Sequence, residues 1–355
     1  MFKTSQKSRF PRGRILRRLI LSFSALVLAL LLAEGALRLA GIPVEFNPER
    51  EVFGKLWFET VHRPSNVPGL DYELAPGLDI GSGKQRIRTN SMGFRAPKTK
   101  KKKPEGVFRV LVLGDSFTFA WGVKRERTYP ALLENLLSSA RSPKVEVINM
   151  GISGYGTKDE VNLLLNRGVP LEPDLVIVQY FLNDPDREPV QPLVAHYRPV
   201  KWWQHLNLTR LAYKWLWKRK VEKLGGGDYY RYLHNDPRSW SAVENSFAKL
   251  GRWKNRHDVP VLVVIFPALN VPAWPEYPYQ DIHRQVMRAA RTQGFATVDL
   301  YPHFKKYPES ELTLPGNNFH PSAKAHEIAA RRISEAIGDK LTQGRPDARP
   351  EKEDK

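Results

Sequence analysis

The chain has 355 residues and no cysteine, with 56 Lys and Arg against 37 Asp and Glu and 41% hydrophobic residues. This length and composition permit a sizeable core, and the missing cysteines exclude a disulfide scaffold, thiolate catalysis and sulfur-based zinc sites. The net charge of +19 is concentrated in residues 1–18, 98–103 and 201–224. Because a DNA-binding face needs a basic stripe on a reading element and none is recognisable, we expect no nucleic-acid partner.

The N-terminus has the pattern of a membrane-targeting segment. Residues 1–18 carry seven basic and no acidic side chains, and the uncharged run Leu19–Ala33 follows. Glu34 and Arg38 lie four residues apart on one helical face, so they can pair at the outer interface or snorkel toward headgroups. We expect a cytoplasmic basic tail over 1–18, an uncleaved transmembrane signal-anchor helix over 19–40 and the remainder outside the cytoplasm. A removed signal peptide and a buried soluble helix are the alternatives.

Residues 41–106 are rich in proline and glycine, which predicts a separate extended or partly β segment that ends in a linker. Five lysines lie between 98 and 103, directly before Pro104. The lysines fit a solvated linker or, alternatively, a site of attraction to anionic lipid headgroups.

From residue 107, apolar runs of strand length alternate with helical patterns. The expected strands are Val107–Leu113, Val145–Asn149, Leu175–Tyr180, Val259–Phe266 and Ala296–Leu300. The expected helices are Tyr129–Ser139, Lys158–Arg167, Ser241–Arg256, Gln280–Gln293 and Ser322 to about Ile337. This alternation predicts an α/β domain over 107–340, with helices on both faces of a five-stranded parallel sheet. The charged tail 341–355 is expected to be disordered.

An insertion over residues 185–240 interrupts the alternation. It holds five of the nine tryptophans and the third basic island. Leu208, Leu211 and Trp215 follow helical spacing, so part of the insertion is expected to be an amphipathic helix. A lid on the domain, an interfacial helix on the membrane and an aromatic platform for sugar rings are the three interpretations.

Chemistry is expected beyond the carboxyl ends of the strands, where parallel sheets bind ligands. Gly114, Asp115 and Ser116 follow the first strand, so a tight turn would present the Ser116 hydroxyl as a nucleophile at the rim of the sheet. The nucleophile elbow of the α/β-hydrolases needs glycine two residues after the serine. Thr118 occupies that position, so that fold is disfavoured.

Three further positions fall at the same edge of the predicted sheet. Gly154 follows the second strand, where a backbone amide can face a developing oxyanion or simply belong to a flexible turn. Asn183 follows the third strand and has a side-chain amide that can donate to the same oxygen. His320 opens the last helix and brings an imidazole to the edge of the sheet.

These residues resemble the SGNH or GDSL hydrolases, which are serine esterases and acyltransferases on a flavodoxin-like sheet. Gly114-Asp115-Ser116 resembles the first sequence block of that family, Gly154 the second, Asn183-Asp184 the third and His320-Pro321 the last. The resemblance covers residues 107 to about 337. It implies a flavodoxin-like three-layer α/β/α sandwich.

The resemblance also implies the roles of these residues. Ser116 would attack an ester carbonyl while His320 accepts its proton and later returns it to the leaving alcohol. The amides of Ser116 and Gly154 with the Asn183 side chain would form the oxyanion hole. The stretch from Arg88 to Arg95 resembles the bacterial membrane-anchored branch of the family, which implies the inner membrane with a periplasmic catalytic domain.

One position departs from the family. The family usually has an aspartate three or two residues before its histidine, and this chain has Asn317 and Asn318 there. An amide does not stabilise an imidazolium as a carboxylate does. A serine–histidine dyad, recruitment of another acid such as Asp299, or a poor catalyst retained for binding all stay open.

The sequence thus predicts a membrane-anchored ester hydrolase acting on acyl or acetyl esters, with envelope polysaccharide as the expected carrier of the ester. An O-acyltransferase with the same serine and histidine, and a weakly catalytic carbohydrate-binding or scaffold protein, are the alternatives. No cofactor or metal is expected, since Gly81–Lys84 lacks the P-loop spacing and Ala330 replaces the second histidine of a zinc-protease motif that would begin at His326.

Overall fold

The computed structural model describes residues 12–41, 60–139, 144–186, 202–269, 271, 274 and 276–341, with the backbone alone at a few positions that include 317–319. They form two compact units. One consists of residues 12–41, which include helix α1 (Arg12–Leu39), and residues 202–219, and the other contains the remaining described residues. Most of the predicted basic tail and all of the predicted C-terminal disordered tail except its first residue lie outside the described residues.

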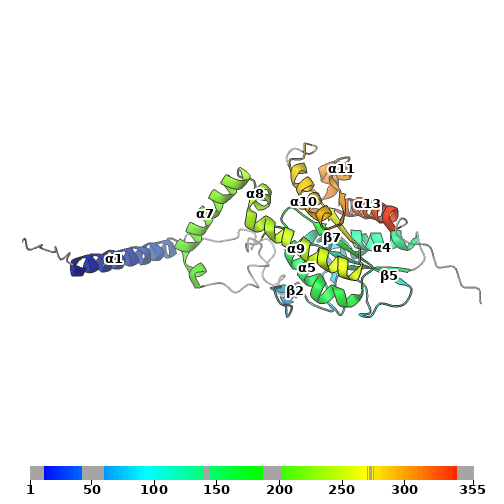
Figure 1. The fold of residues 1–355 in the computed structure, drawn as a ribbon, viewed down its shortest axis with the longest axis horizontal. Coiled ribbons are helices and arrows are strands. Elements are labelled where there is room, and N and C mark those ends of the chain that lie inside the picture. Colours follow the sequence, from blue (N-terminus) through cyan, green and yellow to red (C-terminus); the bar gives the residue numbers. More distant parts are fainter. Residues whose placement is uncertain are drawn as a thin grey trace, which may run out of the picture. The chain divides into compact units, whose positions relative to one another are not determined.

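The larger unit is built on a five-stranded parallel sheet (Figure 1). Its strands, in spatial order, are β6 (Lys144–Asn149), β5 (Val107–Leu113), β7 (Leu175–Tyr180), β8 (Val261–Ile265) and β9 (Ala296–Asp299). The first strand in the chain therefore lies between the second and the third, which is the flavodoxin-like order. This order confirms the predicted fold class.

Helices cover both faces of the sheet. Helix α4 (Tyr129–Ser139) packs against α13 (Ala323–Leu341), while α9 (Pro237–His257) packs against α5 (Thr157–Leu163) and α10 (Gln280–Thr292). Right-handed crossovers from these strands place the first pair of helices on one face and the other three on the opposite face. The strands are therefore buried on both sides, which explains their nearly continuous Val, Ile and Leu content.

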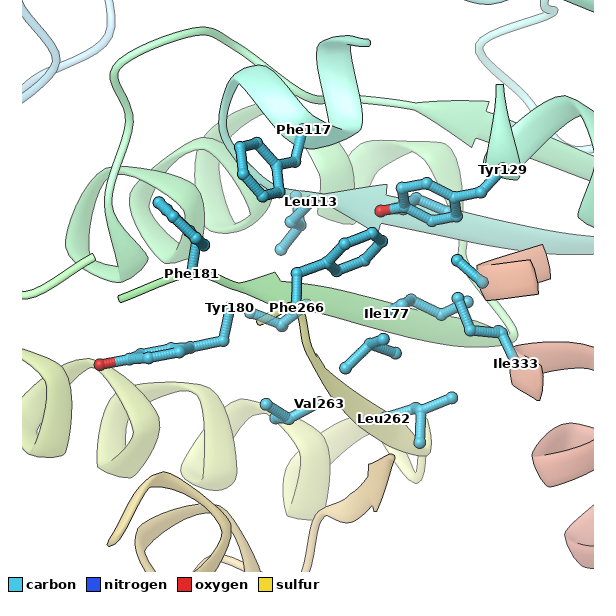
Figure 2. Packing of buried hydrophobic residues seen from close by; sticks show 14 of the residues in the cluster. Leu113, Phe117, Tyr129, Ile177, Tyr180, Phe181, Leu262, Val263, Phe266 and Ile333 are labelled. Carbon is cyan, nitrogen blue, oxygen red and sulfur yellow. The ribbon is translucent and has the colours of Figure 1, made fainter. Parts of the chain in front are cut away.

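The core continues into the turn that follows β5 (Figure 2). The Phe266 ring lies 5.9 Å from the Phe117 ring and 5.5 Å from the Tyr129 ring, measured between centroids. Phe117 belongs to the short helix α3 (Ser116–Phe119), and its side chain is fully buried. Because close-packed aromatic rings resist displacement, the residue before Phe117 is held in place by the core.

Arg109 is a fully buried cation inside the otherwise apolar strand β5. Its Nε donates to Glu146 Oε2 on the neighbouring strand at 2.8 Å, and its two terminal nitrogens donate to the carbonyls of Lys100, Lys101 and Leu171. The lysine run is therefore partly structural, since its backbone satisfies a buried guanidinium.

The segment upstream of the sheet contains four short strands. Strands β1 (His62–Pro64) and β2 (Tyr72–Leu74) pair antiparallel, as do β3 (Asp79–Ile80) and β4 (Ile87–Arg88). Glu73 on β2 forms ion pairs with Arg63 and with Arg167, each at 2.6 Å. Arg167 lies in a π-helical turn that follows α5, so the segment is fastened to the α/β layers.

The Trp-rich insertion divides between the two units. Helix α8 (Tyr229–Asn235) and Trp240 pack on the larger unit. Helix α7 (Asn207–Gly225) begins in the smaller unit, where Trp202 and Trp215 are 78% and 55% exposed.

Helix α1 is long and apolar enough to cross a membrane, and it is the one described helix that is. The candidate span, Arg14–Leu39, has 26 residues and is almost entirely exposed, which argues against a buried core helix. Such a helix near the N-terminus fits a signal sequence or an anchor.

Candidate active site

Ser116 lies directly beyond the carboxyl end of β5, in a turn that only certain residues permit. A Cβ atom on Gly114 would lie 2.1 Å from Thr118 Oγ1 and 2.4 Å from Gln179 Oε1, so a side chain there has no room. Asp115 caps α3 by accepting the Phe117 N–H at 2.8 Å. Ser116 therefore begins a short helix at the point where the strand order reverses.

The structure brings Ser116 and His320 together across 204 positions of the chain. Ser116 Oγ lies 3.0 Å from His320 Nε2, which is hydrogen-bond distance. His320 belongs to strand β11 (Asn317–Pro321), which directly precedes α13. Ser116 is only 9% exposed and His320 7%.

The environment of His320 keeps its imidazole neutral. Burial lowers the pKa of His320 to about 4, because a charged imidazolium is poorly solvated there. The Phe117 ring contributes to this apolar surrounding, with its centroid 5.8 Å from that of the imidazole. A neutral imidazole can accept a proton from the serine hydroxyl at ordinary pH.

The residue that orients the far side of the His320 ring stays a prediction. Asn317, in the position of the usual family aspartate, has only its backbone described. Asp299, the alternative acid, is engaged elsewhere: its Oδ1 lies 2.8 Å from His283 Nδ1 and accepts the Tyr301 N–H at 3.0 Å. The structure thus places Asp299 with His283.

The predicted oxyanion donors lie on the loops after β5, β6 and β7. Among the described residues, the backbone N–H groups of Ser116 and Gly154 have no hydrogen-bond acceptor. Gly154 has a φ of +79°, a conformation that favours glycine. Asn183 is half-buried in the turn after β7, where Asp184 accepts the Phe181 N–H.

Two buried polar side chains that the sequence analysis did not assign to the site hold these loops. Gln179 Oε1 on β7 accepts from Asp115 N at 3.2 Å and from Thr118 Oγ1 at 2.8 Å. Asn149 at the end of β6 donates to the Thr118 carbonyl at 2.7 Å. The sequence offered one indication of such a contact: Gln179 is a polar residue inside an otherwise apolar strand, and a buried polar group needs a hydrogen-bond partner.

Three carboxyl groups are fully buried near Ser116: Asp115, Glu160 and Asp184. Burial raises the pKa of Asp115 to about 7. Burial first, and then the nearby acidic groups, raise the pKa of Glu160 and Asp184 well above the usual range. Protonation of these groups limits the negative charge that would oppose an oxyanion.

The upstream segment also contacts the loops of the site. The Tyr72 hydroxyl donates to the Ser153 carbonyl at 2.7 Å, and Trp121 Nε1 donates to Ser153 Oγ at 2.5 Å. The Arg95 guanidinium donates to the carbonyls of Phe119, Ala120 and Val123, at the end of α3 and just beyond it. Its burial lowers the pKa of Arg95 to about 10.

The chain also matches a known family. The family model described as "GDSL-like Lipase/Acylhydrolase family" matches residues 112–328, more than half of the chain. The protein belongs to this family. The predicted family and the predicted enzyme class are confirmed, and this GDSL acylhydrolase is an ester hydrolase.

Several solved structures resemble this GDSL acylhydrolase. A two-domain esterase (CEX) active on acetylated mannans is 18% identical with a TM-score of 0.43; the match covers 68% of this chain and 51% of the esterase, so the chain spans about half its length. LAE5, an alpha/beta hydrolase enzyme from the metagenome of Lake Arreo, is 17% identical with a TM-score of 0.43, covering 65% and 95% of the two chains. Axe2, an acetylxylan esterase from Geobacillus stearothermophilus, is 18% identical with a TM-score of 0.42, covering 65% and 94%. None of the curated proteins compared matches the chain.

Proposed function

We propose that the protein is a membrane-anchored serine ester hydrolase whose catalytic domain lies outside the cytoplasm and removes acyl or acetyl groups from envelope carbohydrate. The observation that carries the catalytic part is the 3.0 Å contact between Ser116 Oγ and His320 Nε2. This contact joins a strand-end serine to a neutral buried imidazole.

In the first half of the proposed reaction, Ser116 Oγ attacks the ester carbonyl while His320 Nε2 takes the hydroxyl proton. The negative charge that develops on the carbonyl oxygen is stabilised by the amides of Ser116 and Gly154 and by the Asn183 side chain. Each such donor contributes roughly 3 kcal/mol in comparable sites. The C–O bond then breaks, His320 returns the proton to the leaving alcohol, and Ser116 carries the acyl group.

In the second half, water attacks the acyl-enzyme and gives its proton to His320. The bond from the carbonyl carbon to Ser116 Oγ breaks, the proton returns to Ser116, and the carboxylic acid leaves. The buried carboxyl groups support both halves, because in their protonated form they add no negative charge beside the oxyanion.

Asn317 is the residue we propose in the position of the usual acid. An asparagine accepts a hydrogen bond from an imidazole N–H through its side-chain oxygen, so it can fix the ring tautomer without stabilising the imidazolium charge. A slow serine–histidine enzyme is the expected consequence. Asn317→Asp should then raise turnover.

The burial of the serine and histidine supports a short acyl group. Ser116 and His320 are each more than nine-tenths covered, and the buried rings of Phe117 and Phe181 pack 4.3 Å apart beside the serine. The half-buried Trp121 indole, fixed by Ser153, offers an aromatic face for a sugar ring. Carbohydrate as the carrier of the ester is supported by this indole and by the proposed location.

Helix α1 supports the anchoring. Its span of 26 residues is about 39 Å long, enough to cross the hydrocarbon region of a bilayer. The basic residues of 1–18 favour a cytoplasmic N-terminus, which puts the hydrolase on the opposite side. We propose the bacterial inner membrane, with the hydrolase in the periplasm.

The full-length protein assayed on p-nitrophenyl acetate tests the catalytic proposal. Ser116→Ala should reduce turnover to background. Ser139→Ala is the matched control, because the Ser139 hydroxyl bonds only a carbonyl of its own helix within the described residues. Equal rates for wild type and Ser116→Ala would refute the proposal.

Two further measurements refine the substrate. The octanoate ester should react at least about tenfold more slowly than the acetate in kcat/KM, because a longer chain meets the packed rings. Products formed in the presence of a sugar acceptor distinguish free acetate, as hydrolysis predicts, from an acylated sugar, as an acyltransferase would give.

A further inference from the structure

We infer that Tyr72, in the segment upstream of the family match, is a positioning residue for the oxyanion hole. Its hydroxyl donates to the carbonyl of Ser153 at 2.7 Å. That carbonyl and the N–H of Gly154 belong to the same peptide unit. The inference rests on the proposed role of the Gly154 amide.

The planarity of the peptide makes this contact consequential. In a trans peptide the C=O and the following N–H point in opposite directions, so a fixed carbonyl fixes the N–H. Gly154, with a φ of +79°, has the permissive backbone that allows a turn peptide to flip. A flip would turn the amide away from the oxyanion, and the bond from Tyr72 opposes it.

The Tyr72 hydroxyl is itself held rigidly. Tyr72 is 2% exposed, and its ring packs edge-on against Tyr155 with centroids 5.4 Å apart. The Tyr155 hydroxyl donates to the Tyr72 carbonyl, so Tyr155 holds the backbone of Tyr72 as well as its ring. Trp121 Nε1 holds the Ser153 side chain at 2.5 Å. Ser153 is therefore held at its carbonyl by Tyr72 and at its side chain by Trp121.

A hydrogen bond to the carbonyl also polarises the peptide. Chains of hydrogen bonds strengthen one another, since electron density drawn toward the accepting oxygen makes the N–H a better donor. Tyr72 thus acts through Gly154 on the charge that forms in the transition state and has little effect on substrate binding in the ground state.

The test is Tyr72→Phe in the full-length protein, which removes the hydroxyl and keeps the ring. We expect kcat on p-nitrophenyl acetate to fall about tenfold with KM unchanged, less than the loss on deleting a donor outright. The affinity for phenylboronic acid, which forms a tetrahedral adduct on the serine, should fall in parallel. Trp121→Phe should change both quantities in the same direction by a smaller factor.

Tyr279→Phe is the matched control, because it deletes a largely buried tyrosine hydroxyl that donates to Asp228 at 2.6 Å. It should leave kcat and boronate affinity unchanged, and each variant is assayed well below its own unfolding midpoint. An active wild type with an unaffected Tyr72→Phe would overturn this inference alone. A wild type without turnover or boronate binding would overturn the proposed function and this inference with it.

A second, independent observation lies in the smaller unit, where we infer that residues 202–219 form a membrane-interface element. It rests on the proposed anchoring by α1. Glu34 in α1 accepts the backbone N–H groups of Asn207 and Leu208 at 3.0 Å each, and Arg38 donates to Glu34 at 2.7 Å and to the His205 carbonyl at 3.2 Å. The start of α7 is thus bonded to the end of the membrane helix.

This attachment fixes the depth of α7. Glu34 directly follows the uncharged run Leu19–Ala33, so its carboxylate marks the boundary of the hydrocarbon. Helix α7 must then begin in the headgroup region. Its first half exposes Leu211, Trp215 and Leu216 at 39–55%, and Lys214, Lys218 and Arg219 are exposed beside them. Tryptophan and lysine together suit an interface with anionic headgroups.

The cysteine-free chain permits a direct test with single labelled cysteines in proteoliposomes that contain phosphatidylglycerol. A polarity-sensitive dye at Leu216→Cys should show blue-shifted emission and quenching by nitroxide-labelled lipid. The dye at Lys249→Cys, on exposed surface of α9, should be quenched only by aqueous iodide. Quenching by iodide and not by lipid at both Leu216→Cys and Lys249→Cys would overturn this inference. Absence of lipid quenching at Leu26→Cys in α1 would overturn the proposed anchoring itself.

Discussion

Two regions, one upstream of the family match and one inserted within it, illustrate different ways of attaching a segment to an enzyme. Residues 60–97 are fastened by buried polar side chains, with Tyr72 on the Ser153 carbonyl and Arg95 on three carbonyls at the end of α3. Residues 202–219 instead expose tryptophan, leucine and lysine, and hydrogen bonds to Glu34 and Arg38 attach them to α1.

This difference separates chemistry from location. A side chain that bonds a loop of the active site affects the reaction, whereas an exposed aromatic side chain on a helix attached to α1 affects where the enzyme resides. Variants in the first region should therefore change stability and turnover. Variants in the second should change neither in a detergent-solubilised assay.

Arg95→Met should give the largest effect and tests the distinction between the two regions most directly. The variant removes three hydrogen bonds to buried carbonyls, of which that of Ala120 still accepts the Val123 N–H, and this predicts a loss of about 3 kcal/mol or more in unfolding free energy and a fall in kcat/KM. Urea unfolding and the p-nitrophenyl acetate assay measure the two. Lys214→Ala on α7 is the control, and equal effects of both variants would contradict the distinction.

Asp115→Asn tests the buried charges beneath Ser116 and should have the next largest effect. Burial raises the folded pKa of Asp115 to about 7, with Glu160 and Asp184 nearby, while an unfolded aspartate titrates near 4. The stabilisation from protonated Asp115 is complete below pH of about 4 and is lost as the pH rises to about 7. Asparagine keeps the acceptor for the Phe117 N–H and does not ionise.

The variant should therefore gain stability over wild type between those pH values, by on the order of 2–4 kcal/mol at pH 8. Thermal unfolding across pH measures the gain. A difference that does not change with pH would contradict the raised pKa.

The acid limb of the pH–rate profile gives a third, smaller effect. Burial lowers the pKa of His320 to about 4, so kcat/KM should stay high down to about pH 5. A histidine with an ordinary pKa of about 6.5 would leave only roughly 3% of the activity at pH 5. Phenyl acetate hydrolysis, followed by phenol release, measures this limb, and a midpoint near 6.5 would show that the imidazole is solvated.

Lys103→Ala should have the smallest effect. Its ammonium pairs with Asp174 at 2.6 Å, but both side chains are partly exposed. Such pairs contribute about 1 kcal/mol or less, so the midpoint of thermal unfolding should shift by only about 2–4 °C. A larger shift would mean that the lysine run is as integral to the larger unit as Arg95.

The strands and the main helices could be predicted because each has a local pattern. Strands β5 and β7 and helix α4 have the predicted ends, since apolar runs bounded by turn residues define them. Strand β8 (Val261–Ile265) is shorter than the predicted Val259–Phe266. Val259 and Pro260 precede the strand and Phe266 follows it. The predicted helix Lys158–Arg167 covers both α5 and the π-helical turn that follows it. The hydrophobic periodicity of the sequence does not distinguish a π-helical turn from a continued α-helix.

The positions of Ser116, Gly154 and Asn183 could be predicted because each follows the end of a strand, and His320 was proposed from its residue type and family motif; the structure brings Ser116 and His320 together, while the roles of all four residues stay proposals. The contacts of Tyr72 and Arg95 were not, because a tyrosine hydroxyl that bonds a carbonyl 81 residues away leaves no local pattern. Gln179 gave a weak signal as the polar residue in an apolar strand. Asp299 could be proposed as an acid from its type alone, yet only the fold reveals its pairing with His283.

The bond from Glu34 to α7 has a consequence for the order in which the protein is made. Glu34 is synthesised 173 residues before Asn207, so under the proposed anchoring α1 enters the membrane long before its partner helix leaves the ribosome. Residues 202–219 are in turn synthesised before β8 and β9. The nascent chain can therefore dock α7 on the membrane helix while the sheet still lacks two strands, and the hydrolase would complete its folding already tethered at the bilayer surface.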